Sequence, residues 1–139
     1  MVHQLAIVRL SRLAAVFGLL VLVGCGGGGG PEIIGNDTSF IPNFDKVWNE
    51  VDAAGTVVPT HQFALLVDQA GQKSGSFNSS SNEQLNGSTN ALTGTYLNKV
   101  VTITVDRGGT KVNISGLFQD ADTIQFKEPT RTYNVKRSQ

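Results

Sequence analysis

Cysteine is almost absent from this chain, and the other residues that most often carry chemistry are also scarce. The 139 residues include one cysteine, one tryptophan and two histidines. A single cysteine cannot close an intramolecular disulfide, and so few thiols and imidazoles do not supply the ligands of a structural zinc site. The 11 basic residues balance the 11 acidic ones. Without a basic excess, the composition argues against nucleic-acid binding.

Long hydrophobic runs are also missing, because the one apolar run near the N-terminus is short. Leu13 to Val23 contains 11 residues and follows Arg9 and Arg12. A membrane-spanning helix needs about 20 apolar residues. A positive region followed by an apolar run of about 7–15 residues and small residues is typical of a secretory signal peptide. The N-terminus is therefore predicted to be an export signal.

The residues behind this run resemble the end of a bacterial lipoprotein signal peptide. Leu22-Val23-Gly24-Cys25 is similar to the lipobox of that class. The resemblance implies cleavage between Gly24 and Cys25, a diacylglycerol on the Cys25 thiol, and acylation of the new amine by a chain such as palmitate. Two or more acyl chains anchor a protein stably at a membrane. An ordinary signal peptide with a coincidental cysteine is the alternative.

Five consecutive glycines, Gly26 to Gly30, separate this cysteine from Pro31. A phosphate loop would need a preceding strand and a Lys-Ser/Thr pair, which this segment lacks. The run is therefore predicted to be a flexible tether. Gly26 at the second mature position, where an aspartate could stand, is similar to lipoproteins sorted to the outer membrane. The resemblance thus implies a lipid-anchored protein of the bacterial envelope, in the outer membrane and facing the periplasm or the cell surface.

The predicted processing divides the chain into three parts. Residues 1–24 are the signal peptide, residues 25–39 the lipidated cysteine and tether, and residues 40–139 a single β domain. Removing 24 of the 139 residues leaves 115, which is enough for one small domain. The signal peptide takes two arginines with it, so nine basic residues face 11 acidic ones and the mature net charge is −2.

Most of the remaining sequence alternates apolar and polar residues, the pattern of half-buried strands. The clearest strand is Lys99 to Asp106, in which three apolar residues at alternate positions share one face. Gly108-Gly109 in the turn that follows predicts a tight hairpin, because glycine readily adopts positive φ. The C-terminal strands predicted after it are Thr110 to Phe118, Thr123 to Lys127 and Arg131 to Lys136, with a turn at Asp120-Ala121-Asp122.

The N-terminal half of the domain is less regular. The predicted strands are Phe44 to Asp52, His61 to Asp68, Lys73 to Asn78 and Ala91 to Leu97. A helix over residues 43–54 competes with the first strand, because its apolar residues also fit helical spacing. The segment from Ser79 to Asn90 is rich in serine and asparagine, and it is interpreted as a long loop or a poor edge strand.

A glycine followed two residues later by an aromatic residue occurs three times. The copies are Gly75-Ser76-Phe77, Gly94-Thr95-Tyr96 and Gly116-Leu117-Phe118. Their spacing predicts three strands that run in the same direction. A strand glycine permits a tightly coiled sheet to bend, and a neighbouring aromatic ring covers the gap. A chance recurrence of a common β pattern is the alternative.

Together these strands predict an all-β domain. Seven or eight short strands joined as a meander favour a small antiparallel up-and-down β-barrel, with a β-sandwich as the alternative. Val100 to Val105 has high β-propensity and no charge. Such a segment on an exposed edge promotes aggregation, which favours closure of the sheet.

This pattern resembles the lipocalin-like (calycin) barrels of small bacterial lipoproteins. The resemblance is carried by Trp48 in the first strand, by the meander and by the closing run Tyr133-Asn134-Val135-Lys136-Arg137. In that family a Gly-x-Trp motif opens the barrel, and an arginine of the last strand packs across the tryptophan. Here Lys46 stands in place of the glycine, and Arg137 or Arg131 is the expected partner.

The sequence contains no recognisable catalytic or metal-binding constellation. His61, the one histidine left after cleavage, is predicted to be a partly exposed strand residue, and no nucleophile-elbow motif accompanies it. Asp120 and Asp122 lack the remaining ligands of a calcium loop and are interpreted as turn residues. We therefore expect no enzyme activity and no cofactor or metal.

Two functions fit these features, and the oligomeric state is left open by both. The first is a structural or interaction module, anchored to the membrane, that contacts another envelope protein. The second is a lipocalin-like binder of a small apolar ligand. Its predicted lining residues are Trp48, Phe63, Phe77, Tyr96 and Phe118. A barrel filled by side chains favours the module and an open apolar cavity favours the binder. The sequence favours the module, because a core needs the same aromatic residues.

Overall fold

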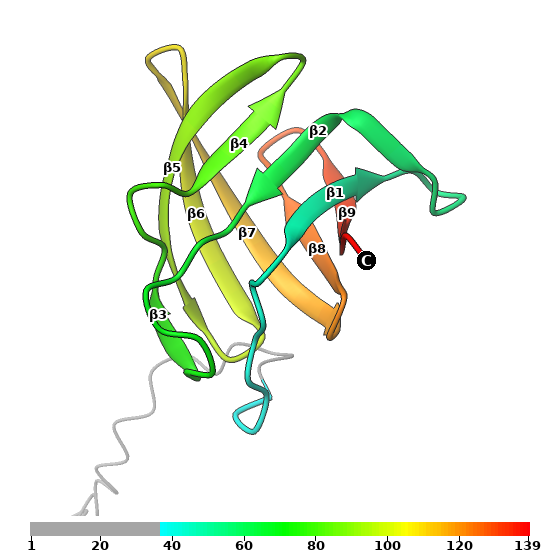
Figure 1. The fold of residues 1–139 in the computed structure, drawn as a ribbon. Helices are drawn as coiled ribbons and strands as arrows, with labels where there is room; N and C mark the ends of the chain where they lie inside the picture. Colours follow the sequence, from blue (N-terminus) through cyan, green and yellow to red (C-terminus); the bar gives the residue numbers. More distant parts are fainter. Residues whose placement is uncertain (1–36) are drawn as a thin grey trace, which may run out of the picture. The chain divides into compact units, whose positions relative to one another are not determined.

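The structure is a computed structural model, and it describes residues 37–139 (Figure 1). The predictions for the signal peptide 1–24, for Cys25 and for the glycine tether lie outside the described residues. Between residues 37 and 139 the regular elements are all β-strands, so the helix weighed for residues 43–54 does not form. No helix capable of spanning a membrane occurs in this part of the chain.

The described residues form a closed antiparallel barrel of eight strands together with one extra strand (Figure 1). The strands are β1 (Val47–Val51), β2 (Val57–Ala64), β3 (Ser74–Ser76), β4 (Asn82–Leu85), β5 (Ser88–Leu97), β6 (Val100–Arg107), β7 (Thr110–Asp120), β8 (Thr123–Lys127) and β9 (Thr132–Arg137). β9 returns to pair with β1, and β5 pairs with both β4 and β6, which closes the sheet. The barrel prediction is therefore confirmed, and the sandwich alternative is not.

The extra strand β3 and the strand β4 pair with different parts of the same side of β5, so the two occupy one position around the barrel. β3 pairs with residues 95–97 of β5, and β4 pairs with residues 88–91 on the same side of that strand. The single bridge between Val67 and Phe77 joins β3 to the chain that follows β2.

Because successive barrel strands alternate in direction, the connections gather at two ends. One end carries the hairpins β1–β2, β4–β5, β6–β7 and β8–β9, and we call it the hairpin end. The other end carries the β2–β3 connection, the β5–β6 and β7–β8 turns and an N-terminal segment, residues 37–46, which we call the strap. This second end is the strap end, where the cyan strap lies at the bottom of Figure 1.

The clearest sequence predictions are confirmed in the C-terminal half. Val101, Ile103 and Val105 all point inward from β6 and are fully buried. Gly108 and Gly109 form the β6–β7 turn with φ of 62° and 89°, as a two-residue hairpin requires. Ile114 and Phe118 of β7 and the inward residues of β9 are likewise buried.

Two predicted boundaries in the N-terminal half are wrong. β2 begins at Val57 and not at His61, because the Asp52 carboxylate accepts hydrogen bonds from the amides of Ala54 and Thr56 and closes an early turn. The segment 79–90 is not a loop or an edge. It contains β4, an Asn86-Gly87 hairpin with positive φ at both residues, and the start of β5.

The glycine repeat is partly confirmed. Gly94 and Gly116 lie on β5 and β7, which run in the same direction, but Gly75 lies on β3, which is antiparallel to β5. The spacing misleads because β3 and β4 occupy one position around the barrel. Aromatic rings from the neighbouring strand do cover two of the glycines. A Cβ on Gly75 would lie 2.7 Å from the Tyr96 hydroxyl, and one on Gly116 would lie 2.5 Å from the Phe126 ring.

Candidate functional site

The inward faces of five strands change from apolar to charged toward the hairpin end. Residues two apart on a strand point to the same face. Each pair therefore places one core residue inside the barrel and one polar residue nearer the hairpin end, where the Arg107 and Arg131 side chains remain partly exposed. The pairs are Trp48 and Glu50, Phe63 and His61, Val105 and Arg107, Phe126 and Glu128, and Tyr133 and Arg131. With Glu83 and Asn90, the polar members and Tyr133 form what we call the charged network.

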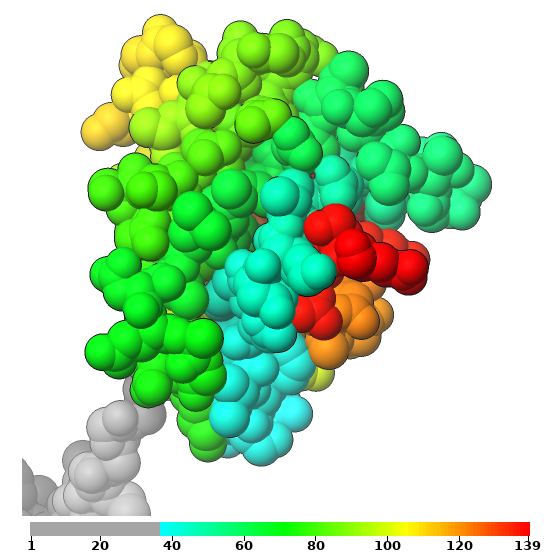
Figure 2. Space-filling model, viewed as in Figure 1, coloured from blue at the N-terminus to red at the C-terminus, as the bar shows by residue number. Residues whose placement is uncertain are grey.

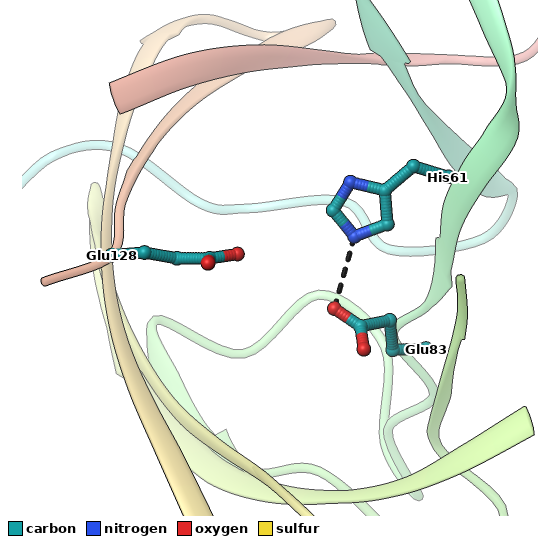
Figure 3. A group of neighbouring side chains, drawn as sticks. All are labelled: His61, Glu83 and Glu128. Carbon is teal, nitrogen blue, oxygen red and sulfur yellow. Dashed lines mark hydrogen bonds and ion pairs between the residues drawn. The ribbon is translucent and has the colours of Figure 1, made fainter. Parts of the chain in front are cut away.

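His61 lies at the middle of this network. Its side chain is 1% exposed, so the prediction of a partly exposed strand histidine is wrong. The Nε2 atom lies 2.9 Å from Oε1 of Glu83, and Nδ1 contacts Oε2 of Glu50. Figure 3 shows the imidazole and the carboxylates of Glu83 and Glu128 directed toward one another across the barrel interior. Both ring nitrogens of His61 thus face carboxylates.

Arg107 joins two of the glutamates through its planar guanidinium. Its Nε and Nη2 atoms donate to Glu83 at 2.8 and 2.6 Å, and Nη1 and Nη2 donate to Glu128 at 3.1 and 2.8 Å. Asn90 donates to the second oxygen of Glu83 at 2.9 Å. Two forked contacts from one arginine fix both carboxylates, because guanidinium and carboxylate groups match in geometry.

Arg131 closes the other side of the network. It donates to Oε1 of Glu50 at 2.9 Å, and its guanidinium stacks 4.0 Å from the centre of the Tyr133 ring. The Tyr133 hydroxyl donates to Glu128 at 2.7 Å. The network therefore joins three carboxylates to two guanidinium groups, one imidazole, one amide and one phenol.

These contacts shift the pKa values of the buried acids. Burial alone would raise the pKa of Glu83, but hydrogen bonds from Arg107, His61 and Asn90 outweigh it and lower the pKa to about 2. For Glu128 burial is likewise opposed, and the hydrogen bonds from Arg107 and Tyr133 lower its pKa. Burial, reinforced by the bond to Glu128, raises the pKa of Tyr133. Both glutamates are therefore ionised at neutral pH, and neither is suited to donate a proton.

Three members of the network could each offer one atom to a metal. The ligand atoms of His61, Glu83 and Glu128 all lie within 4.8 Å of one another (Figure 3). Oxygens of both glutamates, however, already accept hydrogen bonds from Arg107, and Nε2 of His61 faces Glu83. A cation would have to displace that guanidinium from both carboxylates. The geometry fits a self-contained ionic network better than a metal site.

The five predicted ligand-lining residues are all buried in the core, from 0% exposed for Trp48 and Phe63 to 7% for Phe77. Phe77 and Tyr96 pack around Phe44, and Phe118 contacts both Phe44 and Trp48. Phe63 lies apart from this group and packs against His61 and Phe126. Four of the five are thus brought together in the strap half of the barrel, while Phe63 borders the charged network.

The strap seals this aromatic half. Phe44 is 4% exposed, and Phe40 packs against Phe118 at a tilt, with ring centres 4.9 Å apart. A cavity of about 230 Å³ remains between the strap and the β2–β3 connection. Its apolar lining residues include Pro42, Phe44, Leu66, Val67 and Tyr96. Sequence reasoning placed Phe44 in the first strand and so missed its role as a plug.

The residues tied to the barrel resemblance also have defined positions. Arg137 is the register partner of Trp48, and its guanidinium bonds to Asp122 and, at 2.9 Å, to Asp45 of the strap. Arg131 instead stacks on Tyr133. The turn interpretation of Asp120 is confirmed, because its carboxylate accepts the amide of Asp122 at 2.8 Å.

Sequence reasoning missed the charged network as a whole. The signal that could have revealed it is the continuation of each inward apolar series by a charged residue or a histidine, at or beside the same end of five strands. Comparison with known proteins finds no matching protein family, curated protein or solved structure. Function is therefore inferred from the residues and their geometry.

Proposed function

We propose that this protein is a lipid-anchored protein of the bacterial envelope whose barrel acts as a structural or interaction module. The observation that carries the module is the filled interior. Aromatic rings and the Phe40–Phe44 segment occupy one half of the barrel, and the charged network occupies the other. Barrels of this size hold at most one small ligand and are often filled by side chains. Contacts with partners would then use the outer surface.

The anchor is supported by the lipobox-like run that ends at Cys25. Its test is the mass of the protein extracted from membranes of cells that process lipoproteins. We expect a chain that begins at Cys25 and carries a diacylglycerol and an acyl chain. A Cys25→Ser variant should retain residues 1–24 and carry no lipid. An unmodified Cys25 in the extracted wild-type protein would contradict the anchor.

Binding of a small apolar ligand is the second candidate, and the cavity beside Phe44 and Tyr96 favours it. At about 230 Å³ it is smaller than the roughly 300–1,000 Å³ typical of ligand pockets. Trp48, the only tryptophan of the chain, is fully buried and reports on the interior. We expect its fluorescence emission to be unchanged when dodecanol is added. A saturable change in emission would favour the ligand binder over the module.

A further inference from the structure

Large apolar side chains that are exposed concentrate at the strap end. The five in the described part of the chain are Ile41 (49% exposed), Val47 (39%), Val57 (51%), Leu66 (38%) and Leu97 (48%). Only Val57 belongs to the hairpin end, where it begins β2 after the β1–β2 turn. Single exposed apolar residues are ordinary, but four of these five lie at one end of the barrel, as expected of an interaction surface.

Specific contacts hold the segments that carry these side chains. The Asn98 side chain, in the β5–β6 turn, donates to the carbonyls of Thr38 and Phe40 at 3.1 and 3.0 Å, which holds the strap beside Leu97. The amide of Leu66 donates to the Ser81 hydroxyl at 2.9 Å. Figure 2 shows the cyan strap lying against the green segment that follows β2. The apolar side chains are therefore presented by ordered backbone.

Charges at the strap end balance one another. The basic residues there are Lys46, Lys73, Lys99, Lys136 and Arg137, and the acidic ones are Asp37, Asp45, Asp68, Asp120 and Asp122. The Arg137 guanidinium bonds to both Asp45 and Asp122. Such an end has no strong field of one sign, so it suits a partner surface of zero net charge.

The position of the proposed lipid anchor in the sequence indicates that a membrane surface lies near the strap end. The described residues begin at Asp37, beside Asn98 of the strap end. Twelve residues, 25–36, separate the proposed anchor from that point. If these residues form the tether predicted from the sequence, their end-to-end distance is roughly 20 Å and cannot exceed about 43 Å when fully extended. An anchor at Cys25 would thus keep the strap end within about 43 Å of the bilayer.

We propose that the strap end docks on a zwitterionic phospholipid surface through Ile41, Leu66 and Leu97. This proposal rests on the lipid anchor proposed above. The three side chains enter the boundary between headgroups and acyl chains, as the apolar faces of peripheral membrane proteins do. The balanced charges stay among the headgroups, and the hairpin end faces away from the membrane. Because no net charge drives the contact, docking is insensitive to salt.

The test places a probe at each end of the mature, lipid-modified protein, residues 25–139. Leu97→Cys and Val57→Cys are matched, since the two native side chains are 48% and 51% exposed at opposite ends. Each variant is labelled with an environment-sensitive fluorophore and reconstituted in phosphatidylcholine vesicles. We expect a blue shift of the emission and quenching by lipid-borne nitroxides at position 97, with neither effect at position 57.

The possible outcomes distinguish a failure of the docking proposal from a failure of the proposed lipid anchor. The wild-type protein serves as the reference, because a lipid-modified Cys25 does not react with the fluorophore. Labelling of Cys25 would show that the anchor is missing, and docking would fall with it. If Cys25 carries lipid and does not react, equal, water-like emission at positions 97 and 57 would overturn the docking proposal and leave the anchor intact. A fluorophore at position 97 that is shielded from water in cells but not on vesicles would indicate a protein partner. That result would also overturn docking on phospholipid.

Discussion

At the scale of single residues, Glu83 is the centre of the barrel's charged half. It is fully buried, and it accepts hydrogen bonds from Arg107 and Asn90 while facing His61. A buried ion pair adds little net stability compared with well-packed apolar residues, but removing one partner leaves an uncompensated charge. The network therefore makes the fold sensitive to the loss of any one member.

Glu83→Gln is expected to lower the free energy of unfolding by about 3 kcal/mol, because Arg107 and His61 lose their shared carboxylate inside the barrel. Urea denaturation followed by circular dichroism measures this change. Asp68→Asn, at an exposed position, is the control and should shift stability by less than about 0.5 kcal/mol. Equal stability of the two variants would mean that the network is not closed as described.

Acid should weaken the protein through the same residue. The pKa of Glu83 is about 2 in the folded state, below its ordinary value of 4.5. A lowered pKa gives a contribution that is complete above pH 4.5 and is lost as the pH falls through about 2. The contribution is about 3 kcal/mol. The stability difference between wild type and Glu83→Gln should thus shrink from pH 5 toward pH 2. A difference that stays constant over this range would contradict the assignment.

At the scale of elements, the strap depends on a few contacts. Residues 37–46 belong to no strand up to the start of β1. Asn98 holds their carbonyls, Arg137 holds Asp45, and Phe44 supplies the packing. Segments with few backbone hydrogen bonds open locally at low free-energy cost. The strap is therefore expected to open before the barrel unfolds.

Asn98→Gly tests how the strap is held. Asn98 and Asn86 both have φ of 51°, which glycine adopts without strain, so either substitution preserves the turn. Only Asn98 bonds the strap, and its loss should cost about 1–2 kcal/mol of local stability. Hydrogen exchange of the amides of Ser39 and Phe40, which are bonded within the strap, should accelerate in Asn98→Gly and stay unchanged in Asn86→Gly. Unchanged exchange in both variants would show that Asn98 does not hold the strap.

Gly94→Ala tests the approach of β5 to β6. A Cβ at this position would clash with the Thr102 carbonyl and lie 2.8 Å from the Ile103 Cα, both backbone atoms that cannot move aside. We expect a loss of about 3 kcal/mol or failure to fold, the upper range for overpacking. Thr93→Ala, the exposed neighbour, should cost less than about 1 kcal/mol. Urea midpoints compare the two, and similar values would contradict the close approach.

Elements with strong alternation could be predicted from the sequence, and those with polar composition could not. β6 was identified because Val101, Ile103 and Val105 alternate with polar residues and a Gly-Gly turn follows. For β4 the sequence predicts a loop or a poor edge strand, because its residues are Asn, Glu, Gln and Leu. Its strand state comes from pairing with β2 and β5 on both sides, a tertiary effect that local propensity does not contain.

The sequence likewise predicts the buried aromatic residues but not the charged network. Aromatic residues were placed inside the barrel because apolar burial follows from composition. Burial of Glu83 depends on Arg107, and that of Glu50 on Arg131, partners 24 and 81 residues away along the chain. These pairings follow from the strand register of the barrel and cannot be predicted from the sequence alone. His61 was consequently assigned to the surface.

At the scale of the whole molecule, the barrel has two unlike halves. The strap half is aromatic inside and carries most of the exposed apolar side chains, while the hairpin half encloses the charged network. Side chains occupy both halves, which supports a module that acts through its outer surface. This asymmetry also gives the barrel a preferred orientation relative to its proposed anchor.

Native mass spectrometry of the protein extracted gently from membranes tests the filled, anchored barrel most directly. We expect the native mass per chain to equal the denatured mass, which in turn equals that of residues 25–139 with covalent lipid. A reproducible additional mass that disappears on denaturation would mean that the interior holds a ligand. That result would contradict the filled barrel and replace the module with a binding protein.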